Sequence, residues 1–257
     1  MKTDLLPLFR ATHLMPYLDL FNGIGVPVEH RMAKAGLPMC FMPGADHYLP
    51  INPTLAFLGN VARDEGIDDL AFRACQGISP GILGAGLWQA IRSAPSLKWA
   101  LDTFFHRAHL EDSSVKWWIE PEAENVKLCS RVDLPIAMNQ VGLSEWHNNL
   151  TILAIVRLFA TPSWLPAKMA FRSNEPAGPF ACNAFENTRI LTGQKAAWIT
   201  LPRSMLALPR FFRGAPRHLA GTPEGLEGLP SGFLGALDTC TMRIEILTPG
   251  IRQFRTG

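Results

Sequence analysis

Residues 81–132 constrain the fold most, because the spacing of their apolar side chains changes from helical to extended near Ser113. Ser96 is expected to cap a helix, since apolar residues then recur three and four positions apart as far as Ala108. From Val115 to Val132, apolar and polar residues alternate on both sides of a turn at residues 121–125. This alternation predicts a β-hairpin, so the chain combines helices with antiparallel strands.

The remaining patterns extend this mixture along the chain. Helical spacing precedes the hairpin in four segments, at residues 12–21, 27–36, 52–66 (with Asn52 as its expected N-cap) and 80–94. A long helix is expected at residues 140–160, before Pro162. Short strands at 167–172, 189–191 and 197–201 and a helix at 179–185 complete the pattern. It predicts an α+β fold, with an N-terminal helical region packed on a small, largely antiparallel sheet and a long central helix.

The periodic patterns stop near residue 210. Residues 1–209 are therefore predicted to form one domain, and residues 210–232, rich in proline and glycine, are predicted to form a linker. Residues 233–257 are expected to contain a short helix, which Ser231 would cap, followed by a tail.

The composition excludes several classes of protein. Of the 257 residues, 47% are hydrophobic and 18% charged, which is typical of a compact domain. A net charge of +2 lacks the positive surplus of a dedicated nucleic-acid binder. The five cysteines form no Cys-x-x-Cys pair, so we expect buried thiols and neither a metal site nor a cofactor. No apolar run is long enough for a signal peptide or a membrane span, and the protein is expected in the cytoplasm.

Three motifs partly resemble catalytic or binding sites. Residues 77–81 match the G-x-S-x-G pattern of hydrolases, but Pro80 follows the serine and has no N–H for an oxyanion hole. His106 and His109 share a helix face, yet no third metal ligand accompanies them, and a helix C-terminus accounts for them. The glycines of residues 81–86 match no phosphate-loop spacing and favour close helix packing instead. The sequence therefore predicts no enzyme.

The aromatic residues suggest a binding site. Trp117 and Trp118 are neighbours on a predicted strand, so they face opposite sides of the sheet. One of them can belong to the core while the other lines a pocket between the sheet and the helix of Trp146. His147 or Arg157 would then be a polar anchor for a ligand. The alternative is that all seven tryptophans are packing residues.

A family resemblance joins these segments. The strongest part is GILGAGLWQAIRSAPSLKWAL at residues 81–101, and weaker parts are MAKAGLP at 32–38, GIDDLAFRACQG at 66–77, NVKLC at 125–129, IVRLFATPSWLPAKMAF at 155–171 and NTRILTGQKAAWITLPRSMLALP at 187–209. In this order they resemble the arabinose-binding-like N-terminal domain of AraC-type transcription regulators. The resemblance implies that residues 1–209 sense a small-molecule effector and dimerise.

Regulators of this type carry a helix-turn-helix domain after the sensor. SGFLGALDTCTMR at residues 231–243 resembles its first helix, but Pro249 and Gly250 interrupt the sequence where the rest should follow. Residues 233–257 are therefore expected to be a remnant of that domain, and the chain alone is not expected to bind DNA. It would form a homodimer or pair with a related full-length regulator. An interaction protein that only pairs with such a regulator is the alternative, and a hydrolase is the most distant one.

Overall fold

The structure is a computed structural model, and it describes residues 6–38, 47–134, 136 and 138–210. Contacts divide the chain into two units, Met1–Phe212 and Arg213–Gly257. The expected helix at residues 232–243 and all but the first residue of the expected linker lie outside the described residues. All the helices and strands that the structure describes belong to the first unit.

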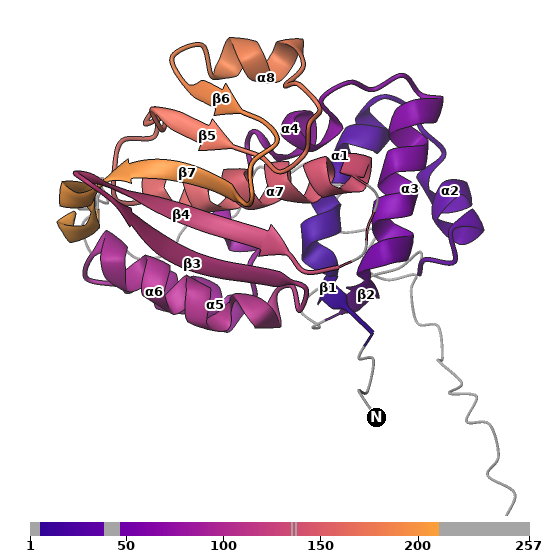
Figure 1. Cartoon of the computed structure of the whole chain (residues 1–257). Helices are drawn as coiled ribbons and strands as arrows, with labels where there is room; N and C mark the ends of the chain where they lie inside the picture. Colours follow the sequence, from indigo (N-terminus) through magenta and orange to yellow (C-terminus); the bar gives the residue numbers. More distant parts are fainter. Residues whose placement is uncertain (1–5, 39–46, 135, 137, 211–257) are drawn as a thin grey trace, which may run out of the picture. The chain divides into compact units, whose positions relative to one another are not determined.

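A five-stranded sheet forms one layer of this unit (Figure 1). Its strand order is β3 (Val115–Glu122), β4 (Asn125–Val132), β7 (Ala197–Pro202), β5 (Lys168–Ala170) and β6 (Arg189–Leu191). All neighbours are antiparallel except β5 and β6. The β3–β4 hairpin confirms the prediction from alternating residues, and its turn is narrower than predicted because pairing continues to Glu122 and Asn125.

The long central helix is also confirmed. Helix α7 (Met138–Arg157) lies behind the sheet in Figure 1 and packs against β4 and β7 and against helices α3 and α4. It ends three residues before the predicted end at Ala160. There the Arg157 Nε–H donates to the Trp164 carbonyl at 3.0 Å and stabilises the turn that follows the helix.

The N-terminal region is helical, as predicted, but it also contains two short strands. Its helices are η1 (Ala11–Leu14), α1 (Met15–Gly23), α2 (Val28–Lys34), α3 (Ile51–Asp64) and α4 (Leu70–Cys75). Strands β1 (Leu8–Arg10) and β2 (Tyr48–Pro50) pair antiparallel, which the sequence patterns did not predict. The predicted cap at Asn52 is wrong, because α3 begins one residue earlier, after the extended Pro50.

The segment predicted as one helix over residues 80–94 is broken. It contains the short helix η2 (Pro80–Ile82) and helix α5 (Ala85–Arg92), separated by extended backbone at Leu83. Helix α6 (Leu97–Arg107) follows, and the Ser96 hydroxyl accepts the Trp99 N–H, which confirms the predicted cap. The remaining helices are η3 (Ala108–Leu110), α8 (Pro179–Ala184) and η4 (Arg203–Ala207).

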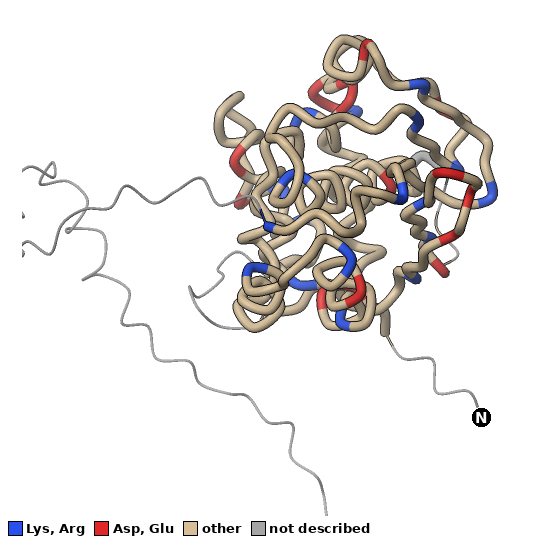
Figure 2. Tube along the Cα trace, turned by 90° about the vertical axis from the view of Figure 1, so that its left-hand side faces the viewer, with Lys and Arg blue, Asp and Glu red and all other residues tan. Residues whose placement is uncertain are grey.

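The charged residues of this unit are mixed in sign. In Figure 2, positions of Lys and Arg alternate with positions of Asp and Glu along the trace, and neither sign gathers on one side of this view. Of the three cysteines described, Cys75 and Cys129 are buried as expected, whereas Cys182 is exposed. None of the helices in the described part of the chain is long and apolar enough to cross a membrane.

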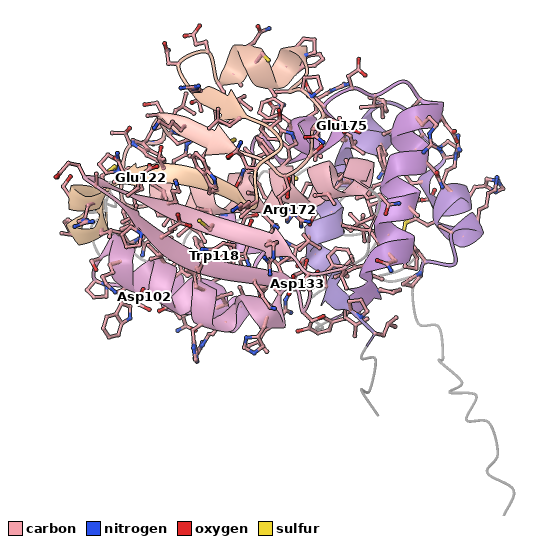
Figure 3. The ribbon with its side chains drawn as sticks, viewed as in Figure 1. Asp102, Trp118, Glu122, Asp133, Arg172 and Glu175 are labelled. Atoms are coloured by element: carbon pink, nitrogen blue, oxygen red, sulfur yellow. The ribbon has the colours of Figure 1, made fainter. Side chains whose placement is uncertain are left out.

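The two faces of the sheet differ in how they are covered. The main core lies between the α7 face of the sheet and the helices. The other face carries a separate small cluster of Trp118, Cys129, Ala170, Leu191 and Trp198, and Figure 3 shows Trp118 on the ribbon face turned toward the viewer. The Lys127 ammonium lies 5.0 Å from the centre of the Trp198 ring and partly covers this cluster. The second cluster is therefore separated from α7 by the sheet itself.

Candidate ligand cavity beside helix α7

Four polar residues lie along one side of helix α7. Ser144, His147, Asn148 and Thr151 follow one another at spacings of three, one and three residues, so they lie on the same helix face. All four line one cavity. A buried helix face of this kind is unusual because polar groups lose hydration there, so each must find a partner or a ligand.

The walls of this cavity are mainly apolar and come from seven elements besides α7. They include residues of β1, η1, α1, α3, α6, η3 and β3, with aromatic rings from Phe9, Tyr17, Phe104 and Trp117. The Trp117 ring is fixed edge to face against Phe104, with 5.2 Å between ring centres. The cavity volume is about 70 Å³. Since one water needs roughly 10–15 Å³ by this measure, the space suits a compact molecule of a few heavy atoms.

One end of the cavity carries a buried ion pair. The Glu111 side chain is 6% exposed, and its Oε2 accepts from Arg10 Nε at 3.0 Å and from His13 Nε2 at 3.1 Å. The other oxygen, Oε1, accepts the Gly84 N–H at 3.0 Å. Burial opposes ionisation, but hydrogen bonds and positive charge from His13 and Arg10 outweigh it and hold the pKa of Glu111 below its usual value. Glu111 is therefore ionised.

A chain of hydrogen bonds leads from Glu111 along the cavity. His13 Nδ1 lies 2.9 Å from His147 Nε2, and His147 Nδ1 lies 3.3 Å from the Cys75 sulfur. Because the Glu111 carboxylate can only accept, His13 donates to it through Nε2–H. In the next two contacts, His13–His147 and His147–Cys75, the tautomers of the imidazoles set which group donates. The charge on Glu111 thus fixes the donor of the first bond of the chain.

Burial favours the neutral forms of two groups along this chain. Burial raises the pKa of the Cys75 thiol to about 12, although its hydrogen bond with Tyr17 acts in the other direction. Loss of hydration and the neighbouring His13 lower the pKa of His147 well below its usual value. Cysteine nucleophiles need a thiolate, so the Cys75–His147 contact is a structural hydrogen bond.

Two polar side chains that line the cavity, Asn148 and Asp112, differ in their hydrogen bonds. Asn148 is 6% exposed, and its amide nitrogen has no hydrogen-bond partner among the described residues. Asp112 accepts from the Ser114 N–H and hydroxyl through Oδ1, and burial raises the pKa of its carboxyl. The neighbouring Asn149 differs from Asn148, because its Nδ2 donates to the Ala170 carbonyl at 3.2 Å. Asn148 thus lines the cavity with an amide whose nitrogen has no protein partner among the described residues.

The structure places the five predicted site residues in different surroundings. Trp117 and His147 line the cavity together. Trp146 lines a separate groove beside α4 and the loop before α8, and Arg157 lines a third hollow near Pro80 and Pro162. Trp118 lies on the opposite face of the sheet in the second cluster. The sheet and the width of α7 keep these three apart from the cavity.

The motifs rejected as catalytic or binding sites have structural roles. Helix α4, not a strand, precedes the G-x-S-x-G segment, and the Ser79 hydroxyl accepts the Gly81 N–H at 3.2 Å. The exposed His109 forms a hydrogen bond through Nδ1 to the His106 carbonyl at the end of α6. Within the part of the chain that the structure describes, no group of three or more His, Cys, Asp or Glu side chains is arranged to hold a metal ion.

Sequence reasoning missed most of the polar end of the cavity. Arg10, His13 and Glu111 come from the start of the chain and from the segment after α6, about 100 residues apart, and no local pattern joins them. Of the four polar residues on this side of α7, only His147 is predicted as a site residue from the sequence, together with Trp146 from the apolar repeat of the helix. Ser144, Asn148 and Thr151 could have been found with it, because they share its helix face.

Comparison with known proteins yields little. No protein-family model matches the sequence, and no curated protein matches it. Among solved structures, the chain is similar to that of the transcriptional regulator CdpR from Pseudomonas aeruginosa, with a TM-score of 0.46 and 10% sequence identity. The match covers 77% of this chain and 57% of that chain, so this chain spans little more than half the length of CdpR. A likeness of this degree assigns neither a family nor a function.

Proposed function

We propose that residues 1–209 are the ligand-sensing and dimerisation domain of a transcription regulator of the AraC type, acting in the cytoplasm and without enzymatic activity. The observation that carries the proposal is the cavity beside α7, where the Asn148 amide nitrogen is buried without a partner. Leaving such a group unsatisfied costs roughly 1–3 kcal/mol, which a ligand bonded to it would recover. The order of sequence motifs supplies the regulator class.

The charge distribution supports a sensor that does not bind DNA by itself. The net charge is only +2, and the basic residues of the described domain are interspersed with acidic ones (Figure 2). Phosphate neutralisation supplies most of the affinity of DNA-binding proteins, so they concentrate positive charge on one face. DNA binding would then depend on a helix-turn-helix domain in the same chain or in a partner.

A thermal-shift screen of small metabolites against the whole chain tests the proposal. A ligand of the folded state at 100 times its Kd raises the free energy of unfolding by about 2.7 kcal/mol. Ser144→Leu fills the cavity from α7 and should abolish the shift, while Gln140→Leu, on the same helix but outside the cavity lining, should keep it. Light scattering should give the mass of two copies. A broad screen without any ligand, or a shift that Ser144→Leu leaves unchanged, would refute the sensor.

A further inference from the structure

We propose that the cavity beside α7 takes a compact, uncharged molecule with a hydrocarbon body and a hydroxyl group that bonds to the Asn148 amide. This inference rests on the proposed function, because it names the class of ligand for the same site. Three properties of the cavity support it: its small volume and apolar walls, the ionisable residues in its lining, and the Asn148 amide nitrogen, which has no partner among the described residues.

The walls select for a small hydrocarbon body. The volume of about 70 Å³ holds roughly five water-sized groups. Leu55, Leu58 and Leu83 and the four aromatic rings supply most of the surface around it. Sugars and other molecules with many hydroxyl groups would lose more hydrogen bonds to water than the few polar groups here could replace.

The polar end disfavours charge of either sign. Burial raises the pKa values of Tyr17 and Asp112, so anionic forms are disfavoured there. The pKa of His147 is well below its usual value, so a cationic form is disfavoured as well. The lining residues include two carboxyl groups and neither lysine nor arginine, while the charge of Glu111 is already balanced by Arg10. A bound carboxylate or ammonium would therefore lose its hydration without a free opposite charge to compensate for the loss.

The unsatisfied amide selects for a hydroxyl group. Asn148 Nδ2 is a donor and therefore needs an acceptor, and the two ends of an amide can exchange places by a rotation of the side chain. A hydroxyl both donates and accepts, so it satisfies either orientation. An ammonium group only donates and a carboxylate only accepts. Asp112, at the same cavity, offers a second acceptor to the hydroxyl proton.

Three probes with one carbon skeleton test the class. They are 3-methyl-1-butanol, 3-methylbutylammonium and 3-methylbutanoate, each titrated into the whole chain by calorimetry at pH 7. We expect the alcohol to bind at least about tenfold more tightly than either charged probe, because neither recovers the cost of desolvating its charge.

Two adjacent asparagines provide the variant and its control. Asn148→Leu should lower the affinity for the alcohol by about tenfold while the apo protein unfolds at the same or a higher temperature, because an unsatisfied donor has been removed. Asn149→Leu breaks the bond to Ala170, so it should lower the unfolding temperature but leave affinity unchanged. Gln140→Leu is a second control. It lies outside the cavity lining and leaves the Asn149–Ala170 bond intact, so it should also leave the affinity unchanged.

The outcomes separate the ligand class from the proposed function. Tighter binding of the ammonium or the carboxylate, equal binding of all three probes, or alcohol binding that Asn148→Leu does not affect would overturn the hydroxyl assignment. The same holds if the alcohol does not bind while the metabolite screen finds another ligand whose shift Ser144→Leu abolishes. In that case the proposed sensor function is retained and only the ligand class is wrong. If neither the probes nor the screen give binding, both proposals fall.

Discussion

The His147 side chain on α7 contacts side chains of η1, α1 and α4. Its ring connects His13, next to the N-terminal strand, with Cys75 on α4, and it stacks against Tyr17 with 6.1 Å between ring centres. Both ring nitrogens have partners, and the ring takes part in the core as a neutral group. Protonation would place a charge inside a largely apolar site, so the fold resists it.

This resistance gives the stability a defined pH dependence. The pKa of His147 in the folded chain lies well below its usual value, whereas in the unfolded chain it returns to about 6.5. Below that pH the unfolded chain binds the additional proton, so the free energy of unfolding falls as the pH falls. The slope is up to about 1.4 kcal/mol per pH unit until the folded pKa is reached.

Urea unfolding at pH 7.5, 6.5 and 5.5 measures this slope. In His147→Gln the loss between pH 6.5 and 5.5 should be smaller than in the wild type by about 1 kcal/mol, because the titrating group is gone. His106→Gln, at an exposed position on α6, should retain the wild-type slope. Parallel slopes for all three proteins would contradict the assignment of the effect to His147.

At the residue scale, local patterns could identify single candidates but not their partners. Trp117 and His147 were chosen because a strand with adjacent aromatics and a histidine on the long helix are visible in the sequence, and both line the cavity. The contact between His13 and His147 spans 134 residues, and spacing along the chain carries no information about it. Glu111 likewise depends on Arg10, which lies 101 positions away in the sequence.

At the scale of elements, the break between η2 and α5 shows how one buried carboxylate shapes a local segment. Gly84 precedes α5, and a Cβ added there would lie 2.7 Å from Arg10 Nη2 and 3.0 Å from Glu111 Oε1. The Gly84 N–H is also one of the donors that hold Glu111. The glycine-rich segment is predicted to allow close packing of another helix. Gly84 instead allows the side chains of the Arg10–Glu111 ion pair to approach the backbone.

Two neighbouring glycines allow a matched test. Gly84→Ala should lower the free energy of unfolding by about 1–3 kcal/mol, because Arg10 and Glu111 are buried and cannot move aside without loss of their hydrogen bonds. Gly86→Ala lies within α5, where an added Cβ meets no atom within 4 Å, and should raise it by about 0.5–1 kcal/mol through helix propensity. Chemical denaturation of both variants checks the signs, and equal effects would show that the ion pair does not restrict Gly84.

Elements whose signals are local were the predictable ones. The hairpin, the cap at Ser96 and the long helix depend on periodicity and side chains a few residues apart, and the structure has them within a few residues of the expected bounds. The β1–β2 pair was missed because each strand has three residues and its partner is about 40 positions away. The break at Leu83 and Gly84 was missed for the same reason, since its cause lies at residues 10 and 111.

At the scale of the whole molecule, the C-terminal part of the described chain closes the core. After β7, the segment η4 packs against α6, and the Leu97 N–H donates to the Leu208 carbonyl over 2.9 Å. Met205, Leu206 and Leu208 lie against the main hydrophobic core. Every buried apolar residue of the described chain falls between Ala11 and Leu201, so the first unit contains its own core. We therefore expect the folding unit to include η4.

Two shortened chains test where the folding unit ends. A chain that stops after Phe212 should unfold cooperatively within about 2 °C of the whole chain and bind the same ligand, because its core and cavity are complete. A chain that stops after Pro202 loses η4 and the acceptor of the Leu97 N–H. Removing three partly buried apolar side chains costs about 2–4 kcal/mol, which lowers the unfolding temperature of a domain this size by roughly 5–15 °C. Calorimetry measures both temperatures, and a marked loss of stability in the longer of the two chains would place part of the sensor's folding energy in residues 213–257.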